Sequence, residues 1–316
     1  MTDSDPVAGR WDSSYHAPVM VEEVVALFKG SRQVLDCTLG GGGHSEALLA
    51  SGSSVVAIDR DEAAITEARE RLAPYEASGR FLALRGNFGE IDRIPELQGR
   101  TFDGVLADLG VSSRQIDADD RGFSFRPGAL LDMRMDRRST GTAADLLNTL
   151  DEADLSQIFR EYGDEPRANR LAREIVRRRD RKPMQVSDDL VDAIRGAYGA
   201  RTGPSEFARF FQAVRIAVND ELTALERALP LLRDMLDRRG VLAVISYHSG
   251  EDRLVKHTIR EWSRDCICPP KQLQCTCRGK ALGEVVTKRA FTANPAETAV
   301  NPRSRSARLR AWRKAA

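Results

Sequence analysis

The sequence lacks any apolar run long enough to cross a membrane. No stretch of about 18 residues is predominantly apolar, and the opening Met-Thr-Asp-Ser-Asp-Pro has neither the basic nor the apolar segment of a secretory signal. We therefore expect no transmembrane helix, no secretory leader and a cytoplasmic location. With 316 residues, 41% of them hydrophobic, the chain can bury a sizeable core and form two domains.

The chain also lacks a strong net charge, because 48 Lys and Arg residues nearly balance 47 Asp and Glu residues. An even distribution would argue against a polyanionic partner, but two segments concentrate the basic residues. Segment 167–182 holds eight of them against two acids, and segment 303–314 holds six with no acid. Each segment fits contact with nucleic acid about as well as it fits a solvated helix face or a frayed tail.

Cysteine is scarce, and four of the five cysteines lie close together. They form two Cys-x-Cys pairs, Cys266 with Cys268 and Cys275 with Cys277. Four thiolates are a typical zinc-binding set, but a spacing of one residue is tighter than in common zinc knuckles. We favour reduced thiols in a loop over bound zinc, predict no required metal, and expect no disulfides in a reducing compartment.

A glycine-rich turn between a predicted strand and a predicted helix is the most informative segment. The strand ends at Asp36, glycine occupies positions 40–43, and His44 opens a helix-like segment. Residues without side chains let the backbone approach a ligand closely, and the free N–H groups of a helix start bind anionic groups. The turn therefore predicts a binding site at the edge of a sheet.

A second acid narrows the class of ligand. The next predicted strand ends at Asp59, 19 positions after Gly40, where a carboxylate suits the two hydroxyls of a ribose. Nicotinamide dinucleotide enzymes share this pattern, and a purely structural turn also fits. However, Ser45 stands where the dinucleotide fingerprint has its third glycine. Asp36 is well placed for the methionine ammonium of S-adenosylmethionine, so we favour that methyl donor.

Alternating strands and helices predict an α/β fold with a parallel, doubly wound sheet. Phe88 and Asp108 follow two further predicted strands, at the edge where ligands collect in such sheets. Helical periodicity without a convincing strand then extends through residues 116–219. A strand at 240–247 returns to the sheet, and segments 283–287 and 307–312 are expected to close it as an antiparallel pair.

These patterns divide the chain into two predicted domains. Residues 1–115 and 220–316 form a discontinuous sheet domain, and residues 116–219 form an inserted all-helical substrate domain.

Several motifs follow one another in order from residue 16 to about residue 310. They are Asp36-x-Thr-x-Gly-x-Gly-Gly-His44, Ala57-Ile-Asp-Arg-Asp61, Gly86-Asn-Phe88, Asp108-Leu-Gly-Val-Ser-Ser113, Arg121-Gly-Phe-Ser-Phe125, Leu131-Asp-Met-Arg-Met-Asp136, Phe211-Gln-Ala-Val-Arg-Ile216, Ser246-Tyr-His-Ser249 and Glu251-Asp-Arg253. With them the chain resembles the bacterial MraW family of 16S ribosomal RNA cytosine-N4 methyltransferases. It departs from the family pattern at Gly250, where Leu is usual, and at Leu130, where Pro is common.

The resemblance implies a Rossmann-like class I S-adenosylmethionine methyltransferase sheet with a helical insertion that binds RNA. It implies methylation of the exocyclic N4 of a cytidine in the decoding (P-site) region of 16S rRNA, within the small ribosomal subunit. Carried over position by position, it implies that the cofactor-binding residues are Gly42, Gly43, His44, Asp59 (on the ribose), Phe88, Asp108 and Gln115. The oligomeric state stays open, a homodimer included.

The chemistry of this reaction selects the candidate catalytic residues. Because the sulfonium methyl is already electrophilic, the enzyme must mainly place the amine in line with it. Asp108 is the first candidate for orienting the amine, followed by Ser112 and Ser113, although contact of Asp108 with the cofactor alone fits nearly as well. His248 is a candidate base after transfer. A structural or RNA-positioning turn is the favoured alternative for His248.

Two other functional classes stay open. A Rossmann-like oxidoreductase would bind nicotinamide, which a cofactor titration detects. An RNA assembly factor would hold S-adenosylmethionine without turnover, which an assay of methyl transfer to small-subunit RNA detects.

Overall fold

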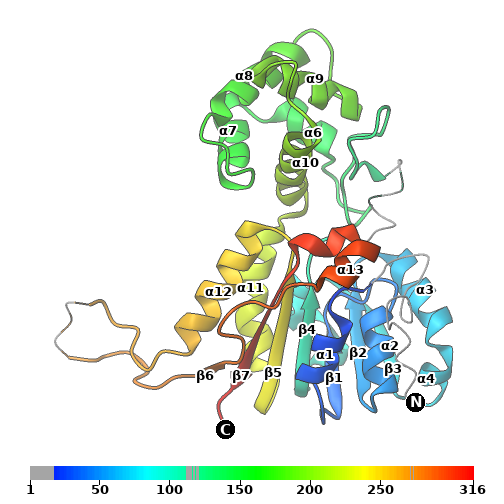
Figure 1. Ribbon diagram of the computed structural model, residues 1–316, viewed down its shortest axis with the longest axis vertical. Coiled ribbons are helices and arrows are strands. Elements are labelled where there is room, and N and C mark those ends of the chain that lie inside the picture. Colours follow the sequence, from blue (N-terminus) through cyan, green and yellow to red (C-terminus); the bar gives the residue numbers. More distant parts are fainter. Residues whose placement is uncertain (1–17, 112–115, 117, 119–120, 271, 273) are drawn as a thin grey trace. The chain divides into compact units, whose positions relative to one another are not determined.

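The computed structural model describes residues 18–111, 116, 118, 121–270, 272 and 274–316. The chain divides into two compact units (Figure 1). The first unit combines Met1–Gly110 with Leu222–Ala316, and the second is Val111–Glu221.

The described part of the first unit is built on one seven-stranded sheet with the order β3-β2-β1-β4-β5-β7-β6. Strands β1 to β5 pair in parallel, and β7 runs antiparallel to both β5 and β6. The strands are β1 (Gln33–Asp36), β2 (Ser54–Asp59), β3 (Phe81–Arg85), β4 (Phe102–Asp108), β5 (Leu236–Ser246), β6 (Gly283–Val285) and β7 (Arg308–Lys314). The predicted α/β fold with a doubly wound, mainly parallel sheet is confirmed.

The C-terminal basic segment is part of this sheet. The expected antiparallel closing pair is confirmed, since Gly283–Val285 pairs with Arg308–Lys314. The alternative of a frayed tail is wrong for this segment, because β7 lies between β5 and β6. Its Arg310 makes a two-point ion pair with Asp252, at 2.7 and 3.0 Å. Part of the positive charge of segment 303–314 therefore serves the fold itself.

Helices cover the sheet, and two apolar clusters hold them to it. Along β2 the side chains alternate: Val55 and Ala57 join one cluster, while Val56 and Ile58 join the other. The first cluster packs α1, α2 and α3 on the sheet, and the second packs η1, α11 and α12. The helices are α1 (Val21–Leu27), α2 (Gly43–Ala50), α3 (Glu62–Arg71), α4 (Ala73–Ala77), α11 (Glu221–Asp234), α12 (Ser249–Trp262) and α13 (Pro295–Val300), with 3₁₀ turns η1 (Phe88–Arg93), η2 (Pro95–Leu97) and η4 (Pro302–Ser306).

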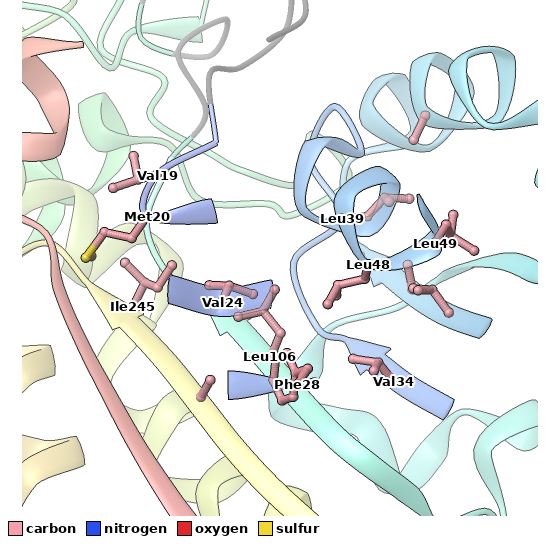
Figure 2. Close-up of a cluster of buried hydrophobic side chains, with 14 of the residues drawn as sticks. Val19, Met20, Val24, Phe28, Val34, Leu39, Leu48, Leu49, Leu106 and Ile245 are labelled. Atoms are coloured by element: carbon pink, nitrogen blue, oxygen red, sulfur yellow. The ribbon is translucent and has the colours of Figure 1, made fainter. Parts of the chain in front are cut away.

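A glycine in the central strand β4 makes room for helix α1. Figure 2 shows Val24 of α1, and Phe28 directly after it, beside Leu106 of β4. A methyl group on Gly104 would lie 2.5 Å from the Phe28 ring. Gly104 is therefore needed for the close approach of α1 to the sheet.

We expect Gly104→Ala to lower the free energy of unfolding of the first unit by about 2 kcal/mol, because overpacking displaces the Phe28 ring. Urea unfolding followed by tryptophan fluorescence measures this, since Trp262 and Trp312 are buried in the first unit. Gly141→Ala is the matched control, because nothing lies within 4 Å of its added methyl group. Equal midpoints for the two variants would contradict the packing explanation.

The described part of the second unit is helical and has its own apolar cluster. Its helices are α6 (Ala143–Thr149), α7 (Glu152–Glu161), α8 (Ala168–Arg179), α9 (Ser187–Tyr198) and α10 (Pro204–Asn219). Amphipathic spacing explains these elements, since the buried residues of α8 recur one helical turn apart at Ala168, Leu171, Ala172 and Ile175. In the residues that the structure describes, no helix of either unit is long and apolar enough to cross a membrane.

Much of the basic segment 167–182 is paired within the second unit. Arg177 and Arg178 share Glu174, and Lys182 contacts Asp189 at 2.9 Å. The Arg179 guanidinium instead donates to two backbone carbonyls of α6 and the residue that follows it. In these ion pairs the carboxylates are mostly buried but the basic side chains remain partly exposed, so the segment retains positive charge that can meet phosphate.

Candidate functional site

The candidate site lies in the first unit, where the carboxyl ends of β1, β2, β4 and β5 meet at one edge of the sheet. Parallel pairing of β1 with β2 and β4 brings the ends at Asp36, Asp59 and Asp108 to that edge. His248 follows β5, which pairs in parallel with β4. The positions predicted on these strands are therefore gathered as expected from the topology.

The glycine turn adopts a backbone that side chains resist. Gly40 and Gly42 have φ values of 50° and 80°, and a methyl group on Gly42 would lie 3.2 Å from Leu72. Gly42 caps helix α2, which begins at Gly43, so the first N–H groups of α2 point out of the turn without partners inside the helix. The turn thus provides backbone donors where the sequence predicted them.

The fully buried Asp36 stabilises the glycine turn through hydrogen bonds. Its carboxylate accepts the Ser45 hydroxyl at 2.7 Å and the Thr38 N–H at 3.0 Å. Burial raises the pKa of Asp36, although these donors and the nearby His44 work to lower it. The predicted contact of Asp36 with an ammonium group stays a prediction, and its observed contacts fix the shape of the turn.

Asp59 links the glycine turn to the following helix. One carboxylate oxygen accepts the N–H of Gly40 at 2.8 Å, and the other accepts the N–H of Asp61 at 2.8 Å. Each carboxylate oxygen has a second lone pair, so both retain the capacity to accept a ribose hydroxyl. Asp59 therefore both shapes the turn and offers the two acceptors that a ribose needs.

Acidification is expected to weaken nucleoside binding before it unfolds the first unit. Burial raises the pKa of Asp59, although the N–H groups of Asp61 and Gly40 work to lower it. The affinity for S-adenosylhomocysteine should be full above this raised pKa and fall as the pH drops through it. Protonation of Asp59 in the same window favours the folded state, because the folded chain holds that proton more tightly than the unfolded chain does.

Calorimetric titrations with S-adenosylhomocysteine from about pH 7.5 to about pH 4.5, with circular dichroism at each pH, test this expectation. In Asp59→Asn the remaining affinity should lose most of its pH dependence. An affinity of the unmodified chain that does not change with pH would contradict the role given to Asp59.

Three side chains meet at the carboxyl end of β4. The Tyr247 hydroxyl donates to the Asp108 carboxylate at 2.9 Å, and the second Asp108 oxygen lies 3.4 Å from His44 Nε2. The Asp108 N–H donates to the Thr38 hydroxyl at 2.7 Å, which ties β4 to the segment after β1. Burial and the neighbouring Asp108 raise the pKa of Tyr247 well above its ordinary value, so Tyr247 remains a donor.

The buried His44 ring has unused hydrogen-bonding capacity. Its ring nitrogens make no hydrogen bond with any described residue, and the 3.4 Å approach to Asp108 lacks hydrogen-bond geometry. A buried polar nitrogen without a partner is costly, which is a sign of a missing ligand. Together with the glycine turn and Asp59, this ring fits an amino-acid-bearing nucleoside such as S-adenosylmethionine.

His248 has a structural position at the start of α12. Its Nδ1 accepts the Glu251 N–H at 3.4 Å as the helix cap, whereas its Nε2, 3.2 Å from a Glu251 carboxylate oxygen, makes no hydrogen bond with a described residue. The other Glu251 oxygen accepts the Tyr247 N–H at 2.9 Å. These contacts support the favoured reading of a structural turn. Gly250 lies in the first turn of α12, so this departure from the family pattern leaves the helix intact.

Of the other predicted site residues, Phe88 is described by the structure and three are not. Phe88 is half-buried at the start of η1 and packs against the second apolar cluster, one strand away from Asp59. Ser112, Ser113 and Gln115 lie outside the described residues. The other departure from the family pattern, Leu130, is 53% exposed in the second unit.

Sequence reasoning missed Thr38, Tyr247 and Glu297 as parts of the site. Thr38 and Tyr247 each follow a strand that ends at this edge. Their positions after predicted strand ends could therefore have identified them. Glu297 arrives from α13 and accepts the Met20 N–H at 2.8 Å, a pairing across 277 positions that no local pattern reveals. Burial and the nearby Glu23 raise the pKa of Glu297, while His44 works to lower it.

Comparison with known proteins identifies the family of the chain. Residues 13–315 match the family model of the MraW methylase family. The chain is 56% identical over 302 residues to ribosomal RNA small subunit methyltransferase H of Gemmatimonas aurantiaca, covering 96% of each chain. It is 43% identical over 306 residues to the protein of that name from Symbiobacterium thermophilum, covering 94% of this chain and 96% of the relative.

A crystal structure of an rRNA methylase from Streptococcus thermophilus aligns with a TM-score of 0.40 and 10% identity, covering 94% of both chains. At this TM-score the likeness carries no weight in the assignment. The family match and the two relatives span nearly the whole chain. On these grounds the chain belongs to the MraW methylase family.

Proposed function

We propose that this protein transfers a methyl group from S-adenosylmethionine to the exocyclic N4 of a cytidine in the P-site region of 16S rRNA. The observation that carries the proposal is the cluster of His44, Asp108 and Tyr247 beside the glycine turn, in which a buried ring lacks partners among the described residues. The names of the relatives supply the class of RNA, and the family resemblance supplies the atom and the region.

The residues of the turn would hold the methyl donor. Asp59 accepts the ribose hydroxyls, the N–H groups at Gly42 and Gly43 meet the carboxylate of the amino acid, and the Phe88 ring stacks on the adenine. His44 gains partners for its ring nitrogens. When bound, S-adenosylmethionine supplies an electrophilic methyl group at a sulfonium centre.

Asp108 is the residue that we assign to the amine. The N4 lone pair of cytosine is delocalised into the ring, so an acceptor for one N–H bond favours the pyramidal nitrogen that attacks. Tyr247 donates to one oxygen of Asp108 and fixes the carboxylate, and we assign acceptance of the amine N–H to the other oxygen, which lies 3.4 Å from His44 Nε2. Ser112 and Ser113 follow four and five positions further along the chain and are the next candidates.

The second unit is the part to which we assign RNA binding. Its α8 and the residues that follow carry the basic segment 167–182, whose basic side chains remain partly exposed within their ion pairs and can meet a phosphate backbone. Unpaired cytidines of a folded RNA are the usual targets of such enzymes, because their bases are free of the stack. We propose the assembled small ribosomal subunit as the substrate and the cytoplasm as the location of the protein. Whether the protein forms a homodimer is to be measured.

The test is transfer of labelled methyl groups from S-adenosylmethionine to small subunits purified from cells that lack this enzyme, followed by nuclease digestion and mass spectrometry of the nucleosides. The proposal expects N4-methylcytidine from one position of 16S rRNA. Label in a different nucleoside would contradict the assigned atom. Binding of the donor with no transfer to subunits or to naked RNA would favour the assembly-factor alternative.

A further inference from the structure

The loop between α12 and β6 is long and has no core of its own. It runs from Ser263 to Leu282, and none of its described residues is buried. Figure 1 shows this segment extending away from the sheet between α12 and β6. Loops longer than about 15 residues without internal structure are uncommon in compact domains, so something else must order its tip.

Four cysteine sulfurs gather at the tip of this loop. The Sγ atom of Cys275 lies 3.8 Å from that of Cys266, 3.9 Å from that of Cys268 and 3.5 Å from that of Cys277. Cys266 and Cys277 are 3.9 Å apart, and all four ligand atoms lie within 4.8 Å of one another. Zinc–sulfur bonds of about 2.3 Å in a tetrahedron place sulfurs about 3.8 Å apart, which matches these distances.

We propose that Cys266, Cys268, Cys275 and Cys277 form a structural zinc site. The sequence alone favours reduced thiols, because a spacing of one residue is tight for a zinc knuckle. The sulfur positions reverse that preference, since the sulfurs of both pairs lie within 4.8 Å of one another and four of their separations are between 3.5 and 3.9 Å.

Other uses of the four thiols fit less well. The closest sulfur pair is 3.5 Å apart, far beyond a disulfide bond of about 2.05 Å. All four are free thiols at the surface or half-buried, where exposed cysteines are chemically vulnerable unless a metal holds them. A tetrahedral all-thiolate set with no open position suits zinc in a structural rather than a catalytic role.

The backbone around the thiols supports a metal-bound state. The Ile267 N–H donates to Cys277 Sγ at 3.3 Å, a contact that stabilises a thiolate. Hydrogen bonds, and not the thiols, hold the two ends of the loop together. The Ala281 N–H donates to the Asp265 carboxylate at 3.0 Å, and the Arg278 guanidinium donates to the Arg264 carbonyl at 3.2 Å. Zinc is therefore needed for the tip, and the stem is held by hydrogen bonds.

The zinc site is separate from the methyl-transfer site. Strand β6, which follows the loop, is at one edge of the sheet, while the glycine turn follows β1 near the middle. We accordingly expect zinc to order the loop and to take no part in methyl transfer.

The test measures metals in the full chain purified in reducing buffer without added chelator. Plasma mass spectrometry should find about one zinc ion per chain. The double variant Cys268→Ser with Cys277→Ser should lose the zinc, while Thr276→Ser, which lies between two ligands and removes no sulfur, should keep it. Replacement of zinc by cobalt should give the thiolate charge-transfer absorption of a tetrahedral site, which the double variant should lack.

A second measurement reports on the loop itself. Trypsin should cleave after Lys271, which lies between the two Cys-x-Cys pairs in the sequence, at least tenfold faster in the double variant, or after removal of zinc by a chelator, because the two pairs are then no longer held together. The proposal is overturned if the purified chain holds no stoichiometric zinc, holds iron in its place, or keeps its zinc in the double variant. A mass lower by the hydrogens of two disulfides, with no metal, would also overturn it.

Discussion

Asp59→Asn is expected to weaken the binding of S-adenosylhomocysteine by about 100-fold. The carboxylate would accept two ribose hydroxyls, and two charge-assisted hydrogen bonds of about 1.5 kcal/mol each amount to about 3 kcal/mol. The amide retains one acceptor oxygen and places an NH₂ group against the N–H of Gly40 or Asp61. Isothermal titration calorimetry measures the change in Kd.

Glu62→Gln is the matched control for this variant. Glu62 lies three residues further on and is exposed, and its carboxylate pairs with Arg85 away from the turn. Its Kd should remain within about twofold of the unmodified chain, because an exposed ion pair contributes little. If Asp59→Asn remains folded by circular dichroism and binds the ligand as tightly as the control does, Asp59 does not hold the ribose.

Asp108→Asn is expected to lower kcat for methyl transfer to small subunits by about 100-fold or more, with a change of less than about tenfold in the Kd of the methyl donor. The reason is that the variant loses the charge that stabilises the developing positive nitrogen. Tyr247→Phe should lower kcat by about tenfold, because it removes only the donor that fixes the Asp108 carboxylate. Single-turnover kinetics with labelled donor measures both.

Asp103→Asn provides the control in the same strand. Asp103 lies near the opposite end of β4, where its carboxylate accepts the N–H groups of Arg32 and Gln33. Its kcat should equal that of the unmodified chain. Should Asp108→Asn weaken donor binding while kcat stays unchanged, Asp108 serves the cofactor only, and the orientation of the amine falls to Ser112 or Ser113.

The sequence was informative wherever local chemistry determines structure. The glycine run after Asp36 required positive φ values and a helix start, and Gly40, Gly42 and the start of α2 show both. Asp59 was recognised because a strand end places its side chain at a known edge of an α/β sheet. The closing antiparallel pair was expected at segments 283–287 and 307–312 and is formed by β6 and β7.

Other features depend on contacts between distant residues, and local patterns do not contain them. Glu297 meets Met20, and Tyr247 meets Asp108, only after the sheet has formed. The same holds for the thiols, because the spacing within each Cys-x-Cys pair says little until the loop brings the two pairs together. The ion pair of Arg310 in β7 with Asp252 was also not predictable, since the two residues are 58 positions apart in the sequence.

A crystal structure of this chain with S-adenosylhomocysteine tests the central claim most directly. The account predicts the ribose hydroxyls within hydrogen-bonding distance of both Asp59 oxygens, and the amino-acid end of the ligand at Gly42 and His44, with a new partner for the His44 ring. Ligand density away from Asp59 and the glycine turn, in crystals where the turn is accessible, would contradict it.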